Sequence, residues 1–139
     1  MVPETIKTHK NKPMILVVED SPTQALHLQA LLEQAGLEVT VATDGQMGLE
    51  LACDLHPALI ILDVELPKMN GLEVCEQLKG APDTSDIPII MLTNHGDREA
   101  FIVFSQNLGV VDYIVKDAFA DAILLEMLRH MGLIGAHTV

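Results

Sequence analysis

Four short apolar runs, each ending in polar residues, constrain the fold of this chain most strongly. Runs of this kind are typical of buried parallel strands. Ligands bind at the carboxyl ends of such strands in open α/β sheets. The sequence therefore predicts one crevice holding three carboxylates, a hydroxyl and an ammonium, a set that suits a divalent metal and a phosphoryl group. The runs and their polar ends are 14–18 with Glu19 and Asp20, 59–62 with Asp63, 89–92 with Thr93, and 113–115 with Lys116.

Helical periodicity between these runs predicts five strand–helix units from Pro13 onward. The first helix is expected to begin at Ser21, in a capping box completed by Gln24, and to end at Gly36. An alternating segment over 37–41 adds a half-buried strand, and the last strand is expected over 110–115. Alternating units indicate a doubly wound five-stranded parallel sheet with five helices on two faces. The later helices are expected to begin at Asp44, Asn70, Asp97 and Asp117, the one from Asp97 ending near 108.

Length and composition indicate one folded domain. The chain has 139 residues, of which 49% are hydrophobic. We expect a polar N-terminal tail over 1–12, a domain over 13–131 and a short C-terminal tail over 132–139. No output domain is predicted, so any signal would pass to another protein.

Charge and cysteine usage exclude several classes of protein. The net charge of −12 argues against direct binding to nucleic acid or to an anionic membrane. No apolar stretch approaches the ~20 residues that span a bilayer, and no signal-peptide core precedes Pro13. Cys53 and Cys75 lack C-x-x-C spacing and fall on predicted helices, which indicates free thiols. These features predict a cytoplasmic protein.

With these residues in this order, the chain resembles the receiver domain of two-component response regulators, over about residues 13–131. The matching features are Glu19-Asp20, Asp63, the pattern Asp63-x-x-x-Pro67-x-x-x-Gly71, Thr93, Tyr113 and Lys116. The resemblance is to single-domain receivers like the chemotaxis regulators. It implies the flavodoxin-like strand order 2-1-3-4-5 and a signalling switch that modifies only itself, rather than an enzyme.

Asp63 is the candidate nucleophile, because a carboxylate can attack phosphorus and form an aspartyl phosphate. Glu19 and Asp20 would hold Mg²⁺ together with Asp63, since this ion prefers oxygen ligands. The resemblance adds the backbone carbonyl of Glu65 as a metal ligand. Helix-dipole complementation alone would also explain the acidic pair.

Lys116 and Thr93 are the candidate partners of the phosphoryl group. The ammonium of Lys116 would bind phosphoryl oxygens, and before phosphorylation it can pair with Asp63. Thr93 would donate a hydrogen bond to the attached group. The resemblance implies that the ring of Tyr113 moves inward when Thr93 engages. A half-buried packing role would also explain this tyrosine.

Asp117 stands where the family usually has a proline, often in a cis peptide. A cis bond without proline costs about 2.5–4 kcal/mol, so the Lys116–Asp117 peptide could be of either form. His95 and Glu65 flank the expected path of attacking water. We hypothesise that this pair sets the dephosphorylation lifetime, the alternative for His95 being a solvated loop residue.

The apolar run 101–104 falls on a predicted helix, where four successive residues cannot all face the core. Ile102 and Val103 are expected to lie nearer solvent, as a surface for a partner or a homodimer. Scattered surface apolar residues are the competing interpretation.

The resemblance implies phosphoryl transfer to Asp63 from a histidine kinase or a phosphotransfer protein. The face formed by the fourth helix, fifth strand and last helix would then change and control a downstream protein, until hydrolysis resets it. The alternative is a phosphorylation-independent protein-binding module, for which the missing proline is the evidence. A dehalogenase-type phosphatase would need an aspartate at Glu65, and a dinucleotide fold would need G-x-G-x-x-G after the first strand.

Overall fold

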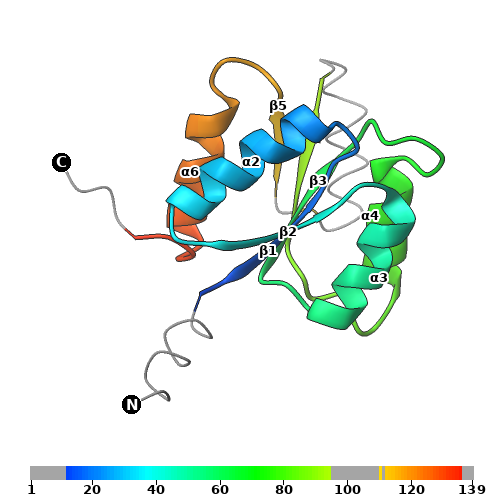
Figure 1. Cartoon of the computed structure of the whole chain (residues 1–139). Helices are drawn as coiled ribbons and strands as arrows, with labels where there is room; N and C mark the ends of the chain where they lie inside the picture. The colour runs from blue at the N-terminus through cyan, green and yellow to red at the C-terminus, as the bar shows by residue number, and fades with distance from the viewer. Residues whose placement is uncertain (1–11, 95–109, 111, 136–139) are drawn as a thin grey trace, which may run out of the picture.

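The five predicted strands form one parallel sheet in the order β2-β1-β3-β4-β5 (Figure 1). The structure, a computed structural model, describes residues 12–94, 110 and 112–135. Each strand matches its apolar run closely, and the predicted fold class is confirmed. The strands are β1 (Met14–Val18), β2 (Glu38–Ala42), β3 (Leu59–Asp63), β4 (Ile89–Thr93) and β5 (Asp112–Val115).

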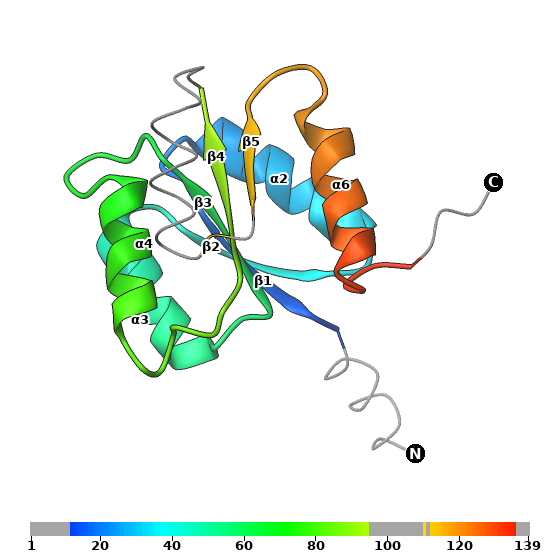
Figure 2. The ribbon, with the colours of Figure 1, turned by 180° about the vertical axis from the view of Figure 1, so that it is seen from behind.

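Helices cover both faces of the sheet, two on each face within the described residues (Figures 1 and 2). Helices α3 (Gly45–Leu55) and α4 (Gly71–Gly80) lie on one face, and α2 (Pro22–Gln34) and α6 (Ala120–His130) on the other. Successive residues of a strand point to opposite faces, and β1 follows this rule. Leu16 and Val18 are buried with α3 and α4, whereas Ile15 and Val17 are buried with α2 and α6. The helix predicted over 97–108 lies outside the described residues.

The side chains at three of the predicted helix starts cap their helices. Ser21 accepts a hydrogen bond from the backbone N–H of Gln24, at 3.4 Å. The carboxylate of Asp44 accepts one from Met47, at 2.8 Å. Asn70 accepts one from Glu73, at 3.0 Å, and so orients α4 directly after the loop that follows β3.

The prediction that Gln24 completes a capping box at Ser21 is wrong. The side chain that accepts from the backbone N–H of Ser21 is Glu19, through Oε2 at 3.2 Å. Because Glu19 already accepts from the backbone N–H of Ser21, the side-chain amide of Gln24 does not bond this N–H. Its oxygen accepts from Lys116 instead.

The start of the last helix also differs from the prediction. Asp117 does not cap it, because α6 begins at Ala120 and its N-cap is Phe119. Asp117 instead accepts a bond from the N–H of Phe119, at 2.8 Å, and closes a turn before the helix. The Lys116–Asp117 peptide is trans, as are the other peptide bonds of the described residues.

Packing on the second face continues to the end of the described chain. Leu133 and Ile134 pack partly against the core cluster shared by α2 and α6, beyond the predicted domain end at 131. Cys53 and Cys75 are both free thiols, as predicted. Burial raises the pKa of Cys75 to about 11. Among the described helices, none combines the length and apolarity needed to cross a bilayer.

Candidate functional site

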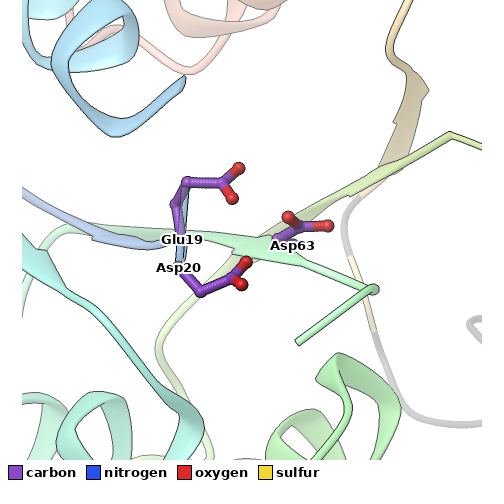
Figure 3. A group of neighbouring side chains, drawn as sticks. All are labelled: Glu19, Asp20 and Asp63. Carbon is purple, nitrogen blue, oxygen red and sulfur yellow. The ribbon is translucent and has the colours of Figure 1, made fainter. Parts of the chain in front are cut away.

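The three carboxylates predicted to share a crevice do meet at adjacent strand ends (Figure 3). Glu19 and Asp20 directly follow β1, and Asp63 is the last residue of β3. The two strands are parallel neighbours, with Val18 opposite Leu62, so their carboxyl ends lie at one edge of the sheet. One carboxylate oxygen from each residue lies within 4.8 Å of the others. Asp63 and Glu19 are buried, and Asp20 is exposed.

Lys116 connects the end of β5 to this cluster. Its ammonium donates to Asp63 Oδ2 at 2.9 Å and to Glu19 Oε1 at 3.3 Å. It also donates to the amide oxygen of Gln24, at 2.8 Å. The backbone N–H of Lys116 bonds the carbonyl of Thr93, at 2.8 Å, which aligns the ends of β4 and β5. The expected pairing of Lys116 with Asp63 is present although Asp117 replaces the proline.

Burial and charge oppose each other at the central ion pair. Burial raises the pKa of Asp63, the hydrogen bond from Lys116 lowers it, and nearby Glu19 raises it further, so the pKa lies above its usual value. Burial alone would lower the pKa of Lys116, but the hydrogen bonds and charges of Asp63 and Glu19 raise it on balance. An added cation would lower the raised pKa of Asp63 again, because a cation stabilises the charged form of the carboxylate.

The donor set fits Mg²⁺. Three carboxylates offer hard oxygen ligands within one small volume, with Asp20 exposed so that water can complete the coordination. Clustered carboxylates repel one another, and a divalent cation would relieve that repulsion. That the backbone carbonyl of Glu65 is a further ligand of the metal ion stays a prediction.

The side chain of Glu65 bridges the loop after β3 and the end of β4. Its Oε1 accepts from the hydroxyl of Thr93 at 3.3 Å and from the backbone N–H of Asn94 at 3.1 Å. The backbone N–H of Glu65 donates to Asp63 Oδ1, at 3.0 Å. Thr93 is only 4% exposed. The carboxylate of Glu65 therefore bonds two donors beside Asp63, which sequence reasoning did not foresee.

Close packing explains why the residue eight positions after Asp63, Gly71, is a glycine. A Cβ on Gly71 would lie 2.3 Å from the carbonyl oxygen of Asp63 and 2.8 Å from Cα of Val64. The N–H of Gly71 donates to the carbonyl of Val64, at 2.9 Å. The first turn of α4 thus packs directly on the backbone that carries Asp63.

Four predicted residues remain, namely Tyr113, His95, Ile102 and Val103. Tyr113 is half-buried on β5 and packs against the core cluster under α3 and α4. His95, Ile102 and Val103 lie outside the described residues.

The contact between Gln24 and Lys116 was not predicted from the sequence, since the position of Gln24 in the first helical turn suggested a cap. The signal that could have found it is its place one turn after the acidic pair.

A family model described as the response regulator receiver domain matches residues 15–129. Protein PilH of Pseudomonas aeruginosa is 36% identical over 110 residues, which cover 79% of this chain and 90% of PilH. A probable transcriptional regulator, ycf27 of Cyanophora paradoxa, is 43% identical over 106 residues. That match covers 76% of this chain and only 43% of the ycf27 protein.

The fold has counterparts among solved structures. The chemotaxis protein CheY4 of Vibrio cholerae superposes with a TM-score of 0.78 at 29% identity. The match covers 86% of this chain and 98% of CheY4.

Proposed function

This chain belongs to the response regulator receiver domain family, and we propose that it is a phosphorylation-dependent switch whose acceptor is Asp63. One observation carries the assignment of the acceptor. Asp63 is only 3% exposed, yet it lies at a strand end with an ammonium 2.9 Å away and two further carboxylates beside it. A structural aspartate would not need this combination of cation and acidic neighbours.

In the proposed reaction, a carboxylate oxygen of Asp63 attacks the phosphorus of a phosphohistidine. The new O–P bond forms as the P–N bond breaks, and its electron pair stays on the imidazole nitrogen. The donor is a histidine kinase or a phosphotransfer protein. Lys116 moves its hydrogen bond from Asp63 to a phosphoryl oxygen and offsets the added negative charge.

Mg²⁺, when held by Glu19, Asp20 and Asp63, would supply the remaining positive charge against the carboxylates and the phosphoryl oxygens. Attack of water on phosphorus later breaks the O–P bond. Inorganic phosphate leaves and the carboxylate of Asp63 is restored. The chain therefore changes only itself, as a switch does.

The output of the switch depends on Thr93. A phosphoryl group on Asp63 would draw the Thr93 hydroxyl away from Glu65, and Tyr113 on the neighbouring strand would follow. We propose that the face around β5 and α6 then changes affinity for a downstream protein in the cytoplasm. Ile102 and Val103 are the proposed contact residues of that face, for a partner or a second copy.

Intact-mass spectrometry after incubation with acetyl phosphate tests the proposal. We expect one added phosphoryl group with Mg²⁺ and none with a chelator, because the ion offsets repulsion at the acidic cluster. Binding of beryllofluoride, a phosphoryl mimic, would reveal a competent acceptor site even where the phosphate adduct hydrolyses too quickly to be weighed. Absence of both the added mass and beryllofluoride binding would contradict the proposal.

The same experiment decides the second candidate function, a phosphorylation-independent binding module. Its support is Asp117 at the proline position. The trans peptide before Asp117 nevertheless leaves Lys116 2.9 Å from Asp63, which favours the switch. A chain that binds a partner but accepts neither phosphate nor beryllofluoride would be such a module.

We further propose that Glu65, together with His95, sets the lifetime of the phosphorylated form. The carboxylate of Glu65 is held beside Asp63 by its bonds from Thr93 and from the N–H of Asn94, and from that position it would orient the attacking water. We expect Glu65→Ala combined with His95→Ala to slow the decay about a hundredfold, the lower end of the range for losing a positioned base. Decay is followed by mass after the donor is removed.

Glu50→Ala is the matched control for this prediction, because Glu50 is an exposed glutamate on α3, away from the strand ends. Its decay rate should equal that of the unmodified chain. Equal decay rates in the double variant and the control would refute the lifetime role.

A further inference from the structure

We propose that Gln24 is a positioning residue that holds the ammonium of Lys116 from the side of α2, so that it can serve first Asp63 and then a phosphoryl group. The inference rests on the proposed function of Asp63. It adds a residue outside the motifs that identify the family in this chain. The contact with Lys116 is made by a neutral amide oxygen, and that neutrality matters for the role.

The geometry of the ammonium is the first argument. A lysine ammonium has three N–H donors, and here three described acceptors surround it. The shortest contact is to Gln24 Oε1 at 2.8 Å, compared with 2.9 Å to Asp63 and 3.3 Å to Glu19. Because the lysine stem is flexible, these acceptors and not the stem decide where the charge lies.

The hydrogen bonds around Ser21 explain why Gln24 is available for this contact. Glu19 uses Oε2 for the N–H of Ser21 and Oε1 for Lys116. The backbone N–H of Gln24 is capped by the Ser21 hydroxyl, which fixes the first turn of α2. The side-chain amide therefore has no capping partner to serve and bonds Lys116.

A cavity beside the site offers the ammonium of Lys116 an alternative position. A cavity of about 590 Å³ lies between α2 and the segment from β5 to α6, and both Gln24 and Lys116 line it. The Lys116 side chain is 15% exposed. Without the amide oxygen, the ammonium could turn into this cavity and leave the acidic cluster.

The neutrality of the amide fits a lysine that must change partners. Glu19, Asp20 and Asp63 already place three carboxylates at the site. A fourth negative charge at position 24 would compete with the phosphoryl oxygens for the ammonium. An amide oxygen instead keeps one N–H occupied while the bond to Asp63 is exchanged for one to the phosphoryl group.

Gln24→Leu tests the inference, since leucine has a similar size and no acceptor. Losing a hydrogen bond to a charged group corresponds to about a tenfold effect or more. We expect about tenfold weaker binding of beryllofluoride by fluorine NMR and about tenfold slower phosphorylation by acetyl phosphate. Mg²⁺ affinity, measured by calorimetry, should not fall, because the carboxylates that would hold the ion are unchanged. Gln29→Leu is the matched control, an amide on the same helix that bonds Glu33.

A readout that does not need phosphorylation completes the experiment. Nitrogen NMR should detect the hydrogen-bonded ammonium of Lys116, assigned by its loss in Lys116→Met. We expect this signal to shift and weaken in Gln24→Leu, where Asp63 and Glu19 remain as acceptors. It should be unchanged in Gln29→Leu and should persist in Gln24→Glu, which keeps an acceptor at this position. An unchanged signal in Gln24→Leu, or beryllofluoride affinity equal to that of the control, would overturn the inference. Failure of the unmodified chain to accept phosphate or beryllofluoride would instead refute the proposed function, and the NMR signal would still decide the contact.

Discussion

Asp63→Asn is expected to abolish the Mg²⁺-dependent phosphate adduct completely. An amide oxygen is a poor nucleophile, and the asparagine side chain cannot form the acyl phosphate that a carboxylate forms. The substitution keeps the shape of a side chain that is 3% exposed, so the fold should persist. It also removes one of three clustered carboxylates, so the rise in melting temperature that Mg²⁺ produces by binding should shrink.

Asp54→Asn is the matched control, because it makes the same change of charge at an exposed position on α3. We expect this variant to accept phosphate at the rate of the unmodified chain. Intact mass measures the adduct, and thermal unfolding with and without Mg²⁺ measures the ion. A full Mg²⁺-dependent adduct on Asp63→Asn would show that another residue is the acceptor and would overturn the assignment.

The strand ends of this fold could be predicted from the sequence because burial on both faces leaves a strong signal. Apolar runs such as 59–62 cannot lie in an exposed strand, and the polar residue after each run marks the edge of the sheet. Parallel neighbours then bring these residues together without further information. The cluster of Glu19, Asp20 and Asp63 followed from topology alone.

Side-chain partners were harder to predict because several acceptors compete for one donor. Gln24 was expected at the N–H of Ser21, but Glu19 reaches that N–H from the other side. Asp117 was expected to cap the last helix, yet it caps a turn three residues before α6. Such choices depend on distances between elements, which a linear pattern does not contain.

Gly71→Ala is expected to destabilise the domain by about 2–3 kcal/mol, the upper part of the usual range for forcing atoms into a packed region. The added Cβ would lie 2.3 Å from a backbone oxygen of Asp63 and 3.0 Å from its carbonyl carbon. No flexible side chain can move aside here, since the nearest atoms are all backbone. For a domain of this size the loss corresponds to a melting temperature lower by roughly 8–12 °C.

Gly80→Ala provides the control within the same helix. A Cβ at Gly80 meets nothing within 4 Å, so this variant should be neutral or gain up to about 1 kcal/mol from better helix propensity. Opposite shifts of melting temperature in the two variants would show that the clash, and not glycine replacement in α4, is responsible. The clash also displaces Asp63 itself, so Gly71→Ala should accept phosphate more slowly even at a temperature where it remains folded. Equal stability and equal phosphorylation in the two variants would refute the close approach of α4 to the acceptor strand.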